Sequence, residues 1–438
     1  MKKLTNKSTF VLFFSLILLI VSCENTDPTV IIPSEPEPEQ TDPINPTPET
    51  IGPIQFFNRD RIDSNYILVN DAKSNAVYII DKDGEVLFDF PLNEGRLGND
   101  AFLLNSGKLL VMLESEDPKI QIGGFGGKLQ MLSPDGTIEW NFDYSSDDHI
   151  LHHDAELLPN GNILTMIWER KTSNESTEAG YLLNVDTFPD ALIEIDPTTD
   201  TIVWEWHIWD HLIQEQDETK SNFGVIADNP QLINVNYVVD EQGDITHGNG
   251  ISYDATNDII YFSANFYSEV WVIDHSTSIE EAATHTGGNY GKGGDLLYRF
   301  GNPSAYNNTQ GNRLFYNNHY PNLLQGEDIG KMLIFSNGAE LERSTVYELN
   351  LPNTFNLSPN TNNEPEVLWS FSHEDLYSPK VSGAEKLPNG NILITEGDFG
   401  IWEVTKEKEI VWKYSVDGFF WRAYHYSKNA TEIKSLGF

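Results

Sequence analysis

The strongest constraint on the fold of this chain is a short hairpin motif that recurs along it. The segment LPNGNIL at residues 158–164 returns unchanged at residues 387–393, and a looser copy, LLNSGKLL, stands at residues 103–110. Each copy is an apolar run, a tight turn that contains glycine and a second apolar run, which is the pattern of a β-hairpin. A recurring hairpin predicts a repeat architecture built from β-strands.

Around this motif the body of the chain divides into six units. Each begins with a strand, continues through the hairpin to an outer strand that ends near Asp or Asn, and finishes with a closing strand that often carries Trp. The units span residues 66–88, 99–140, 152–204, 247–298, 319–369 and 382–412. Four strands per repeat are typical of a β-propeller, and no long segment has the period of a helix.

A pair of β-sandwiches and a β-helix are the alternative all-β folds. The number of strands per repeat and the closing Trp favour a six-bladed β-propeller of four-stranded blades over residues 54–438. We expect residues 53–57 to add a strand to the last unit and to close the ring.

The N-terminus has the features of an export signal. Lys2, Lys3 and Lys7 precede an almost wholly apolar run at residues 10–21, which is short for a membrane-spanning helix. The run ends in Ile20-Val21-Ser22-Cys23, which resembles a bacterial lipobox; an ordinary signal peptide with an incidental cysteine is the alternative. We therefore expect residues 1–22 to be a lipoprotein signal peptide and Cys23 to carry the lipid. The protein is then anchored in the bacterial cell envelope, on the periplasmic or the cell-surface face of a membrane.

The next segment is predicted to be a disordered tether. Residues 24–53 contain eight prolines and seven acidic residues but no Lys or Arg, so they cannot bury enough apolar surface to fold. Residues 23–53 are therefore expected to link the lipid to the body. Cys23 is the only cysteine, which excludes an intrachain disulfide, a Cys-based zinc site and a Cys nucleophile in the body. The net charge of −40 argues against nucleic acid or an anionic membrane surface as a partner, so membrane contact is expected only through the lipid.

Histidines occupy one position of the repeat in three consecutive units. When the units are aligned on the hairpin, His153, His247 and His319 coincide at the start of the first strand. In a propeller this strand lines the central channel, so the three side chains are expected to meet at one end of it. A single histidine there would most simply make a structural hydrogen bond, but three at one repeat position predict a functional site. Such a cluster could transfer protons, act as a nucleophile or hold zinc.

The order of several motifs in this chain resembles one enzyme family. HHDAELLPNGN at residues 152–162 is followed by HGN at 247–249, NNH at 317–319, FSNG at 335–338 and WRAYHY at 421–426. This order is similar to that of the bacterial PAPS-independent arylsulfotransferases, over roughly residues 60–430. The resemblance implies a six-bladed propeller that moves a sulfuryl group from a phenolic sulfate ester to a phenolic acceptor through a transiently sulfated histidine. It implies no metal and no other cofactor.

The resemblance also implies roles for individual residues. By motif position the nucleophile is His319, His247 is the second catalytic histidine, and His153 or its neighbour His152 is the first. The implied donors to the sulfuryl oxygens are Asn249 and Asn318. Asn265 stands where the family carries an arginine, and Arg299 and Arg343 are the candidates to replace that cation. His425, in the last motif, is interpreted as packing or ring closure.

Three other functions compete with the sulfotransferase. A sulfate-ester hydrolase would use the same site with water as acceptor. A non-catalytic surface lipoprotein would bind a glycan or a sulfated ligand, which the change at Asn265 favours and the three histidines disfavour. A quinone-dependent dehydrogenase propeller is disfavoured because the chain has no repeated Trp-docking motif and no calcium-site pattern.

Overall fold

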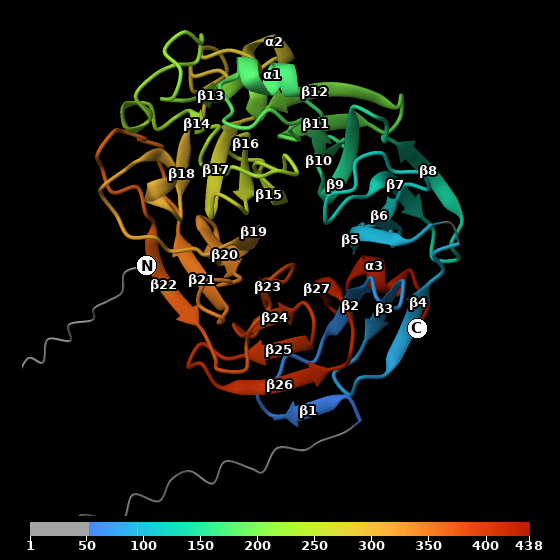
Figure 1. The fold of residues 1–438 in the computed structure, drawn as a ribbon. Coiled ribbons are helices and arrows are strands. Elements are labelled where there is room, and N and C mark those ends of the chain that lie inside the picture. The colour runs from blue at the N-terminus through green and yellow to red at the C-terminus, as the bar shows by residue number, and fades with distance from the viewer. Residues whose placement is uncertain (1–51, 94) are drawn as a thin grey trace, which may run out of the picture. The chain divides into compact units, whose positions relative to one another are not determined.

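The computed structural model describes residues 52–93 and 95–438, and these residues form a six-bladed β-propeller (Figure 1). Six antiparallel sheets surround a central axis, and four strands of each sheet run from the axis to the rim. The fold predicted from the repeated hairpin is therefore confirmed. The expected signal peptide, Cys23 and nearly all of the expected tether lie outside the described residues.

Each blade has four strands, ordered from the axis outward. Blade 1 contains β27 (Phe420–Tyr426), β2 (Tyr66–Asp71), β3 (Ala76–Ile80) and β4 (Val86–Phe90). Blade 2 contains β5 (Leu97–Leu103), β6 (Leu109–Glu114), β7 (Gly127–Leu132) and β8 (Ile138–Asp143). Blade 3 contains β9 (His149–Leu157), β10 (Ile163–Glu169), β11 (Asp190–Asp196) and β12 (Thr201–His207). Blade 4 contains β15 (Gly248–Asp254), β16 (Ile259–Ala264), β17 (Glu269–Asp274) and β18 (Tyr298–Phe300). Blade 5 contains β19 (Asn318–Leu323), β20 (Lys331–Ser336), β21 (Thr345–Asn350) and β22 (Glu366–Phe371). Blade 6 contains β23 (Gly383–Lys386), β24 (Ile392–Glu396), β25 (Gly400–Val404) and β26 (Ile410–Ser415).

The ring closes through β27, which comes late in the chain but forms the innermost strand of blade 1. Tyr66 therefore opens the second strand of blade 1, not the first as the repeats predicted. The expected N-terminal strand does join the last blade, because β1 (Ile54–Phe57) pairs with β26 as a fifth, outer strand. The prediction that this strand closes the ring is wrong, since β27 closes it.

The recurring motif forms the hairpins that join the two inner strands of blades 2, 3 and 6. In each copy the leucine directly before the turn (Leu104, Leu158 or Leu387) donates its N–H to the carbonyl four residues later at 2.8 Å. The turn glycine of each copy has a left-handed φ between 82° and 90°, which costs a glycine little. The three turn glycines are Gly107, Gly161 and Gly390.

The closing tryptophans tie four of the six blades to the blade that follows. They stand on the outermost blade strands β8, β12, β22 and β26, and each indole N–H donates to a residue of the following blade. The pairs are Trp140 with Asp200, Trp204 with Thr277, Trp369 with Lys406 and Trp412 with Lys82. The regular spacing of Trp in the sequence thus reflects a repeated contact between blades.

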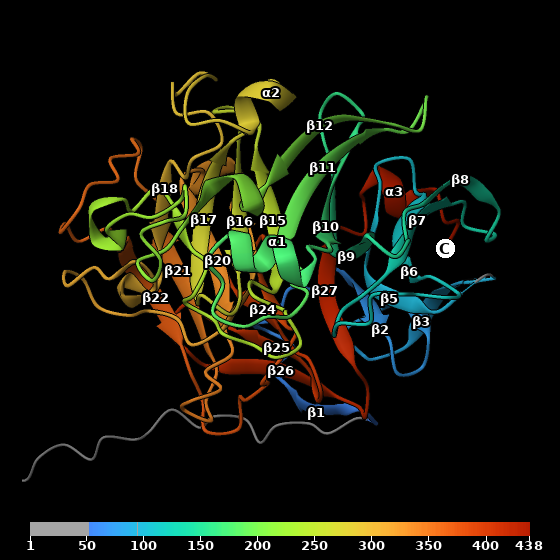
Figure 2. The same ribbon diagram turned by 45° about the horizontal axis from the view of Figure 1, so that its top comes forward.

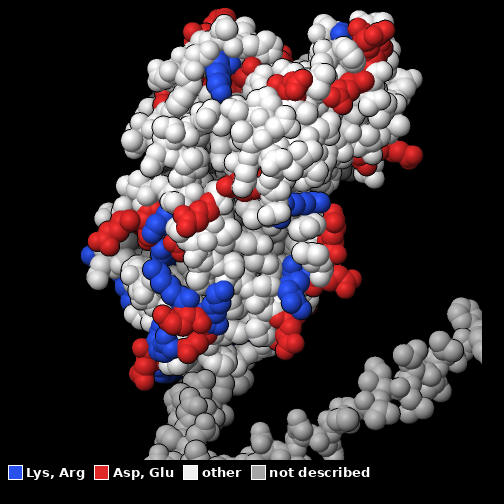
Figure 3. All heavy atoms as spheres, turned by 90° about the vertical axis from the view of Figure 1, so that its left-hand side faces the viewer, with Lys and Arg blue, Asp and Glu red and all other residues white. Residues whose placement is uncertain are grey.

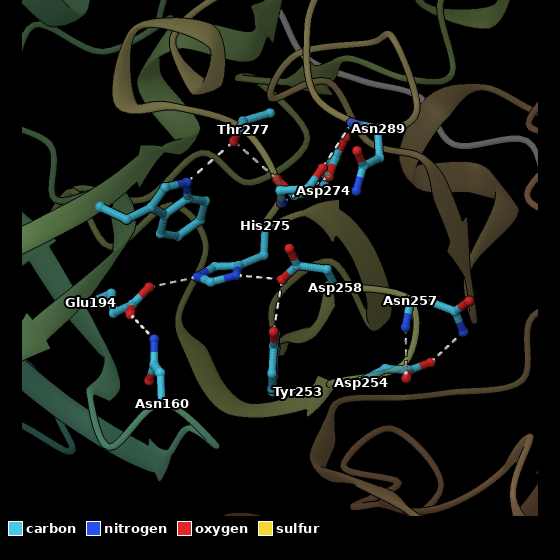
Figure 4. Close-up of polar contacts among 12 residues, drawn as sticks. Asn160, Glu194, Tyr253, Asp254, Asn257, Asp258, Asp274, His275, Thr277 and Asn289 are labelled. Atoms are coloured by element: carbon cyan, nitrogen blue, oxygen red, sulfur yellow. Dashed lines mark hydrogen bonds and ion pairs between the residues drawn. The ribbon is translucent and has the colours of Figure 1, made fainter.

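A second repeated contact joins blades through a glutamate on the third strand. Glu403 contacts Lys82 at 2.7 Å, and Glu348 contacts Lys386 at 3.0 Å. At the same repeat position in blade 3, Glu194 meets His275 of blade 4 at 2.8 Å (Figure 4).

The remaining elements are short, and α2 stands at the top of the molecule in Figure 2. They are α1 (Ser173–Glu178), η1 (Ile208–His211), β13 (Leu212–Ile213), η2 (Ile226–Asp228), β14 (Ile233–Asn234), α2 (Ile279–Ala282), η3 (Pro303–Tyr306), η4 (Gly326–Asp328) and α3 (Thr431–Lys434). Among the described residues, no helix has the length and apolar character needed to cross a membrane. Acidic and basic side chains are interspersed on the face shown in Figure 3, so the negative net charge is partly compensated locally there.

Candidate active site

Irregular backbone accompanies the histidines on three inner strands. His153 lies in the middle of β9, His247 directly before β15 and His319 near the start of β19. The pairing of β9, β15 and β19 with their neighbours shifts register where the histidines lie, which marks β-bulges. His153 and His247 adopt left-handed φ values of 53° and 51°, and Asn317 and Tyr320 on either side of His319 have values of 61° and 53°. Such values are uncommon for residues other than glycine and recur at functional sites.

His319 is held in one orientation and one tautomer. Its Nδ1 lies 2.6 Å from Oδ1 of Asn337, and the amide nitrogen of Asn337 donates to the carbonyls of Ser378 and Val381 at 2.9 and 3.0 Å. Because these two bonds turn the Asn337 oxygen toward the ring, Nδ1 of His319 carries the proton. The other nitrogen, Nε2, keeps its lone pair and has no hydrogen-bond partner among the described residues.

The surroundings of His319 keep its ring neutral. The side chain is 7% exposed and has no carboxylate partner in the part of the chain that the structure describes. Burial, helped by positive charge on His247 and Arg422, lowers the pKa of His319 to about 3 although the bond to Asn337 opposes this. At neutral pH, His319 is therefore a neutral imidazole with a proton on Nδ1 and a free lone pair on Nε2.

His247 has the opposite electrostatic environment. Its Nδ1 lies 2.6 Å from Oδ2 of Asp244, and its ring stacks on Phe266 with centroids 4.7 Å apart. Burial favours the neutral ring, but the charge and the hydrogen bond of Asp244 outweigh it and raise the pKa of His247. Its Nε2 also lacks a partner within the described residues, so a protonated His247 presents Nε2–H as a free donor.

The structure separates the two neighbouring histidines of β9. The ring of His153 meets that of His247 with centroids 5.0 Å apart, whereas His152 is wholly buried and stacks on Trp168 at 3.9 Å. His152 Nε2 lies 3.1 Å from Oδ1 of Asp190 but is not aligned for a hydrogen bond.

His152 forms a hydrogen bond with His153 and so orients its ring. Their Nδ1 atoms are 2.9 Å apart, so one ring donates to the other and Nε2 of His153 is left without a partner among the described residues. Burial, together with the neighbouring histidines and Arg422, lowers the pKa of His153 well below its ordinary value. His153 is thus the member whose ring meets His247, and His152 is a positioning residue.

The three asparagines predicted to bind substrate form a network around one carbonyl. The backbone oxygen of Asn318 accepts hydrogen bonds from the amide nitrogens of Asn249 at 2.8 Å and Asn265 at 3.0 Å. The Asn318 side chain points into the blade, where it donates to Ser263 and to the Glu269 carbonyl. Asn265 is next to the nucleophile candidate, with its nitrogen 3.5 Å from Nδ1 of His319. The asparagines therefore shape the His319 strand, and each of Asn249 and Asn265 retains a second N–H for a ligand.

The structure brings neither predicted arginine to the histidines. The Arg299 side chain on β18 is completely buried and forms a bidentate pair with Glu269, and one of its nitrogens donates to the Leu232 carbonyl at 3.0 Å. Arg343 is exposed in the loop that connects β20 and β21. The expectation that Arg299 holds the sulfuryl group is therefore not supported by its position.

A third arginine lies near the axis and was not identified as a site residue from the sequence. Arg422 on β27 pairs with Asp154 at 2.8 and 2.9 Å and with Asp100 at 3.0 Å, and one of its nitrogens donates to the Asn249 carbonyl at 3.3 Å. It also lies over the Tyr320 ring at 4.2 Å. Arg422 therefore joins inner strands of blades 1 to 5 directly beneath the histidines. In the sequence, the only indication that Arg422 belongs to the site is its place in the last motif, WRAYHY at residues 421–426.

The family of this chain follows from a comparison of its sequence with models of known protein families. The family model described as arylsulfotransferase (ASST) matches residues 51–434, which is nearly the whole described chain. The chain belongs to the arylsulfotransferase family. The resemblance inferred from the motifs is confirmed, and the family assignment supports a transferase that acts on aryl sulfates and phenols.

The other comparisons found only distant similarities. No curated protein sequence matches this arylsulfotransferase chain. Similar solved structures include a protein of unknown function from Bacteroides caccae (14% identity, 82% of this chain and 98% of that chain, TM-score 0.48) and a functionally unknown protein from Desulfotomaculum acetoxidans DSM 771 (11%, 83% and 99%, 0.44). A putative 6-phosphogluconolactonase from Bacteroides fragilis is also similar (11%, 83% and 99%, 0.42). We base no conclusion on similarities at these TM-scores.

Two polar residues of this arylsulfotransferase site were missed by sequence reasoning. Asp244 precedes His247 by three residues, and Asn337 lies in the FSNG motif, yet neither was assigned a role. Asp244 raises the pKa of its histidine, and Asn337 fixes the tautomer of His319. Both act through a histidine and are positioning residues.

Proposed function

We propose that this arylsulfotransferase moves a sulfuryl group from an aryl sulfate to a phenol through a sulfohistidine at His319, without PAPS. The observation that carries the proposal is the opposite pKa shift of two histidines at one site. His319 has a pKa lowered to about 3, and His247 has a raised pKa. A pair of groups with pKa values driven apart in this way identifies the base or nucleophile and the acid.

In the first half-reaction, Nε2 of His319 attacks the sulfur of the aryl sulfate. The N–S bond forms while the bond from sulfur to the aryl oxygen breaks, and the departing aryloxide takes the proton from Nε2 of His247. A phenol has a pKa of about 10, so protonation by an imidazolium assists its departure. Nδ1–H of His319 stays bonded to Asn337 throughout.

In the second half-reaction the acceptor phenol occupies the same place. The phenol gives its proton to Nε2 of His247, its oxygen attacks sulfur, and the N–S bond breaks to restore the lone pair of His319. The proton that the acceptor phenol gives to His247 replaces the one that His247 gave to the departing aryloxide, so the cycle needs no external acid or base.

The surroundings suit an aromatic substrate with a negative head group. The imidazolium of His247 supplies positive charge beside His319, and the free N–H of Asn249 and of Asn265 can meet sulfuryl oxygens. Trp421 meets the His153 ring edge-to-face with centroids 6.1 Å apart, and Phe266 stacks on His247. These aromatic rings offer surfaces for the donor and acceptor rings.

The test is turnover of 4-nitrophenyl sulfate by the purified protein, with and without a phenol acceptor. We expect the acceptor to accelerate release of nitrophenol and to become a new sulfate ester. His319→Ala abolishes both, whereas the surface substitution His373→Ala changes neither. Donor alone, quenched early, gives a peptide containing His319 that is heavier by one SO3 group.

Each other result would decide against the proposal in a defined way. Acceptor-independent release of nitrophenol that requires His319 would identify a sulfate-ester hydrolase. Binding of aryl sulfates without turnover would identify a non-catalytic binding protein in which Asn265 replaces the family arginine.

We also propose that Cys23 is lipidated and anchors the exported protein in the cell envelope. The lipobox-like residues 20–23 and the single cysteine support this proposal. In a bacterial host, Cys23→Ser should prevent incorporation of labelled fatty acid and release the protein from the membrane fraction. Ser22→Ala, which keeps a small residue before the cysteine, should leave both unchanged. Membrane association of the Cys23→Ser protein would contradict the proposal.

A further inference from the structure

A cluster of three potential metal ligands lies at the rim of blades 3 and 4. It consists of His211 at the end of η1, His285 in the loop after α2, and Asp295 shortly before β18. The Nδ1 atoms of His211 and His285 lie 2.9 and 2.7 Å from the same carboxylate oxygen of Asp295. The three ligand atoms all lie within 4.8 Å of one another. The cluster shares no residue with the active site.

The His211 ring is fixed with one nitrogen directed at the cluster. His211 is completely buried, and its ring lies nearly parallel to that of Trp206, at 8° with centroids 5.8 Å apart. Its Nε2 lies 2.9 Å from the carbonyl of Ala282, so Nε2 carries a proton and donates it. Nδ1 is then a lone pair facing a carboxylate oxygen, an arrangement that needs either a second proton or a cation between them.

The lack of a side chain at Gly294 lets the His211 ring come close to the Ala282 carbonyl. A Cβ at Gly294 would lie 2.4 Å from Nε2 of His211 and 2.0 Å from the Ala282 carbonyl oxygen. Only glycine therefore permits the His211 ring and the Ala282 carbonyl to come together beside Asp295. An outer carbonyl that orients a ligating histidine through its other nitrogen is a general feature of metal sites.

One side of the cluster is open. Asp295 has a side chain that is only 9% exposed, whereas the side chain of His285 is 62% exposed. His285 also lines a cavity of about 650 Å³ whose other walls include Glu175, Glu178 and Asp210. These acidic side chains favour a cation in the cavity, and the opening leaves room for a water or a ligand beside the three protein atoms.

We propose that His211, His285 and Asp295 bind a divalent transition-metal ion of the zinc type. Two imidazole nitrogens and one carboxylate oxygen form a common ligand set for zinc with a fourth position open. A tetrahedral ion about 2.1 Å from each atom would hold neighbouring ligand atoms about 3.4 Å apart. The contacts of 2.9 and 2.7 Å that His211 and His285 make with Asp295 would therefore both lengthen when the ion binds. The ion would tie the glycine-rich loop of residues 283–295 to blade 3.

The test is calorimetric titration of the metal-stripped, tag-free full-length protein with Zn²⁺, together with visible absorption after addition of Co²⁺. We expect one Zn²⁺ per chain and the intense absorption bands of tetrahedral Co²⁺. His285→Ala should weaken Zn²⁺ binding at least about 10- to 100-fold, the loss that even an outer-shell partner causes. His285 is exposed, so this variant should fold normally, which circular dichroism checks.

The matched control is His373→Ala, because His373 is a surface histidine 3.8 Å from a carboxylate oxygen of Asp375. It should leave binding of Zn²⁺ and Co²⁺ unchanged. Absence of binding to the unmodified protein would overturn the proposal and leave an imidazolium–carboxylate pair at this place. Equal affinity in His285→Ala would overturn it too. Sulfuryl transfer by His285→Ala is expected to persist, so failure of this proposal is distinguishable from failure of the proposed function.

Discussion

His319 and His275 are both largely buried but have opposite electrostatic surroundings. The comparison distinguishes a histidine proposed to react with substrate from a histidine that holds two blades together. His319 lies at the axis with an amide oxygen as its partner, and its pKa is lowered to about 3. His275 lies between blades 3 and 4, 2.8 Å from Glu194 and 2.7 Å from Asp258 (Figure 4). Burial alone would lower the pKa of His275, but the two carboxylates outweigh it and raise the pKa.

The comparison shows that burial does not decide the role of a histidine. Both rings are buried and both use their Nδ1 atoms, but His275 also commits Nε2 to a carboxylate. The result is an imidazolium with no free lone pair, which suits a contact between blades and excludes nucleophilic attack. An amide in place of the carboxylates gives His319 the reverse properties.

The largest expected effects are those of replacing His319 and His275, one at a time. We expect His319→Ala to reduce turnover by on the order of 10⁴-fold or more, because the proposed nucleophile is lost. His275→Gln should retain turnover but lower the free energy of unfolding by about 3 kcal/mol, since it leaves two carboxylates without their cation. Initial rates with an aryl sulfate, and denaturant unfolding of both variants, measure the two effects. A His275→Gln protein that is stable but inactive would break the comparison.

A smaller effect should follow from giving His319 a carboxylate partner. Asn337→Asp should raise the pKa of His319 above its ordinary value and protonate the nucleophile, which lowers turnover at neutral pH by about 100-fold. The loss should be regained as the pH rises above the new pKa. The profile of turnover against pH measures this. Asn337→Ala is the control and should lower turnover without moving the acid limb of the profile; an Asn337→Asp profile like that of the unmodified protein would contradict the assignment.

His247 lies between the two extremes, because a single carboxylate raises its pKa. Asp244→Asn should lower the pKa of His247 and weaken it as an acid. For aryl sulfates whose phenol has a high pKa and is a poor leaving group, we expect turnover to fall by about 10-fold or more. Turnover of nitrophenyl sulfate should change little, since a good leaving group needs less protonation. A series of aryl sulfates with different phenol pKa values measures the dependence. Equal losses across the series would remove His247 from the acid role.

The smallest expected effects are changes of stability with pH, and they have opposite signs for the two rings. The pKa of His275 is higher in the folded protein than in the unfolded chain, where it is about 6.5. The free energy of unfolding therefore contains the full contribution of His275 below about pH 6.5, and this contribution is lost as the pH rises through the pKa of the folded protein. The folded pKa of His319 is lowered, so protonation in the unfolded state costs stability at about 1.4 kcal/mol per pH unit as the pH falls from about 6.5 toward 3.

Unfolding free energies at pH 5 and pH 8 test this sign difference. The gap between the unmodified protein and His275→Gln should narrow at pH 8. Relative to the unmodified protein, His319→Gln should gain stability at pH 5. Trends of the same sign in both variants would show that the two environments do not differ as described.

Much of the fold could be predicted because it repeats. The LPNGNIL turns, the closing tryptophans and the alignment of His153, His247 and His319 each depend on local spacing that recurs in the sequence. The order of strands in blade 1 could not be predicted, because an inner strand has the same alternation wherever it stands in the chain. The partner of β2 is β27, which begins at Phe420.

The finer features of the site depend on contacts between distant residues. Asp244 and Asn337 follow patterns that also describe ordinary turns, so only their positions beside a ring reveal their roles. Arg299 was a reasonable candidate from charge alone. Its pairing with Glu269 on the neighbouring strand, and the nearness of Arg422 to the axis, follow from strand register and ring closure.

The position of β27 makes the assembly of this protein all-or-none. Arg422 is delivered by that strand, and without it Asp100 and Asp154 of blades 2 and 3 would face each other as buried carboxylates with no cation. A nascent chain therefore has neither a complete first blade nor a neutralised centre until residues 420–426 are free to insert. Loss of this short segment would disable a centre built by five blades, and catalytic competence is expected only after nearly the entire polypeptide has been released.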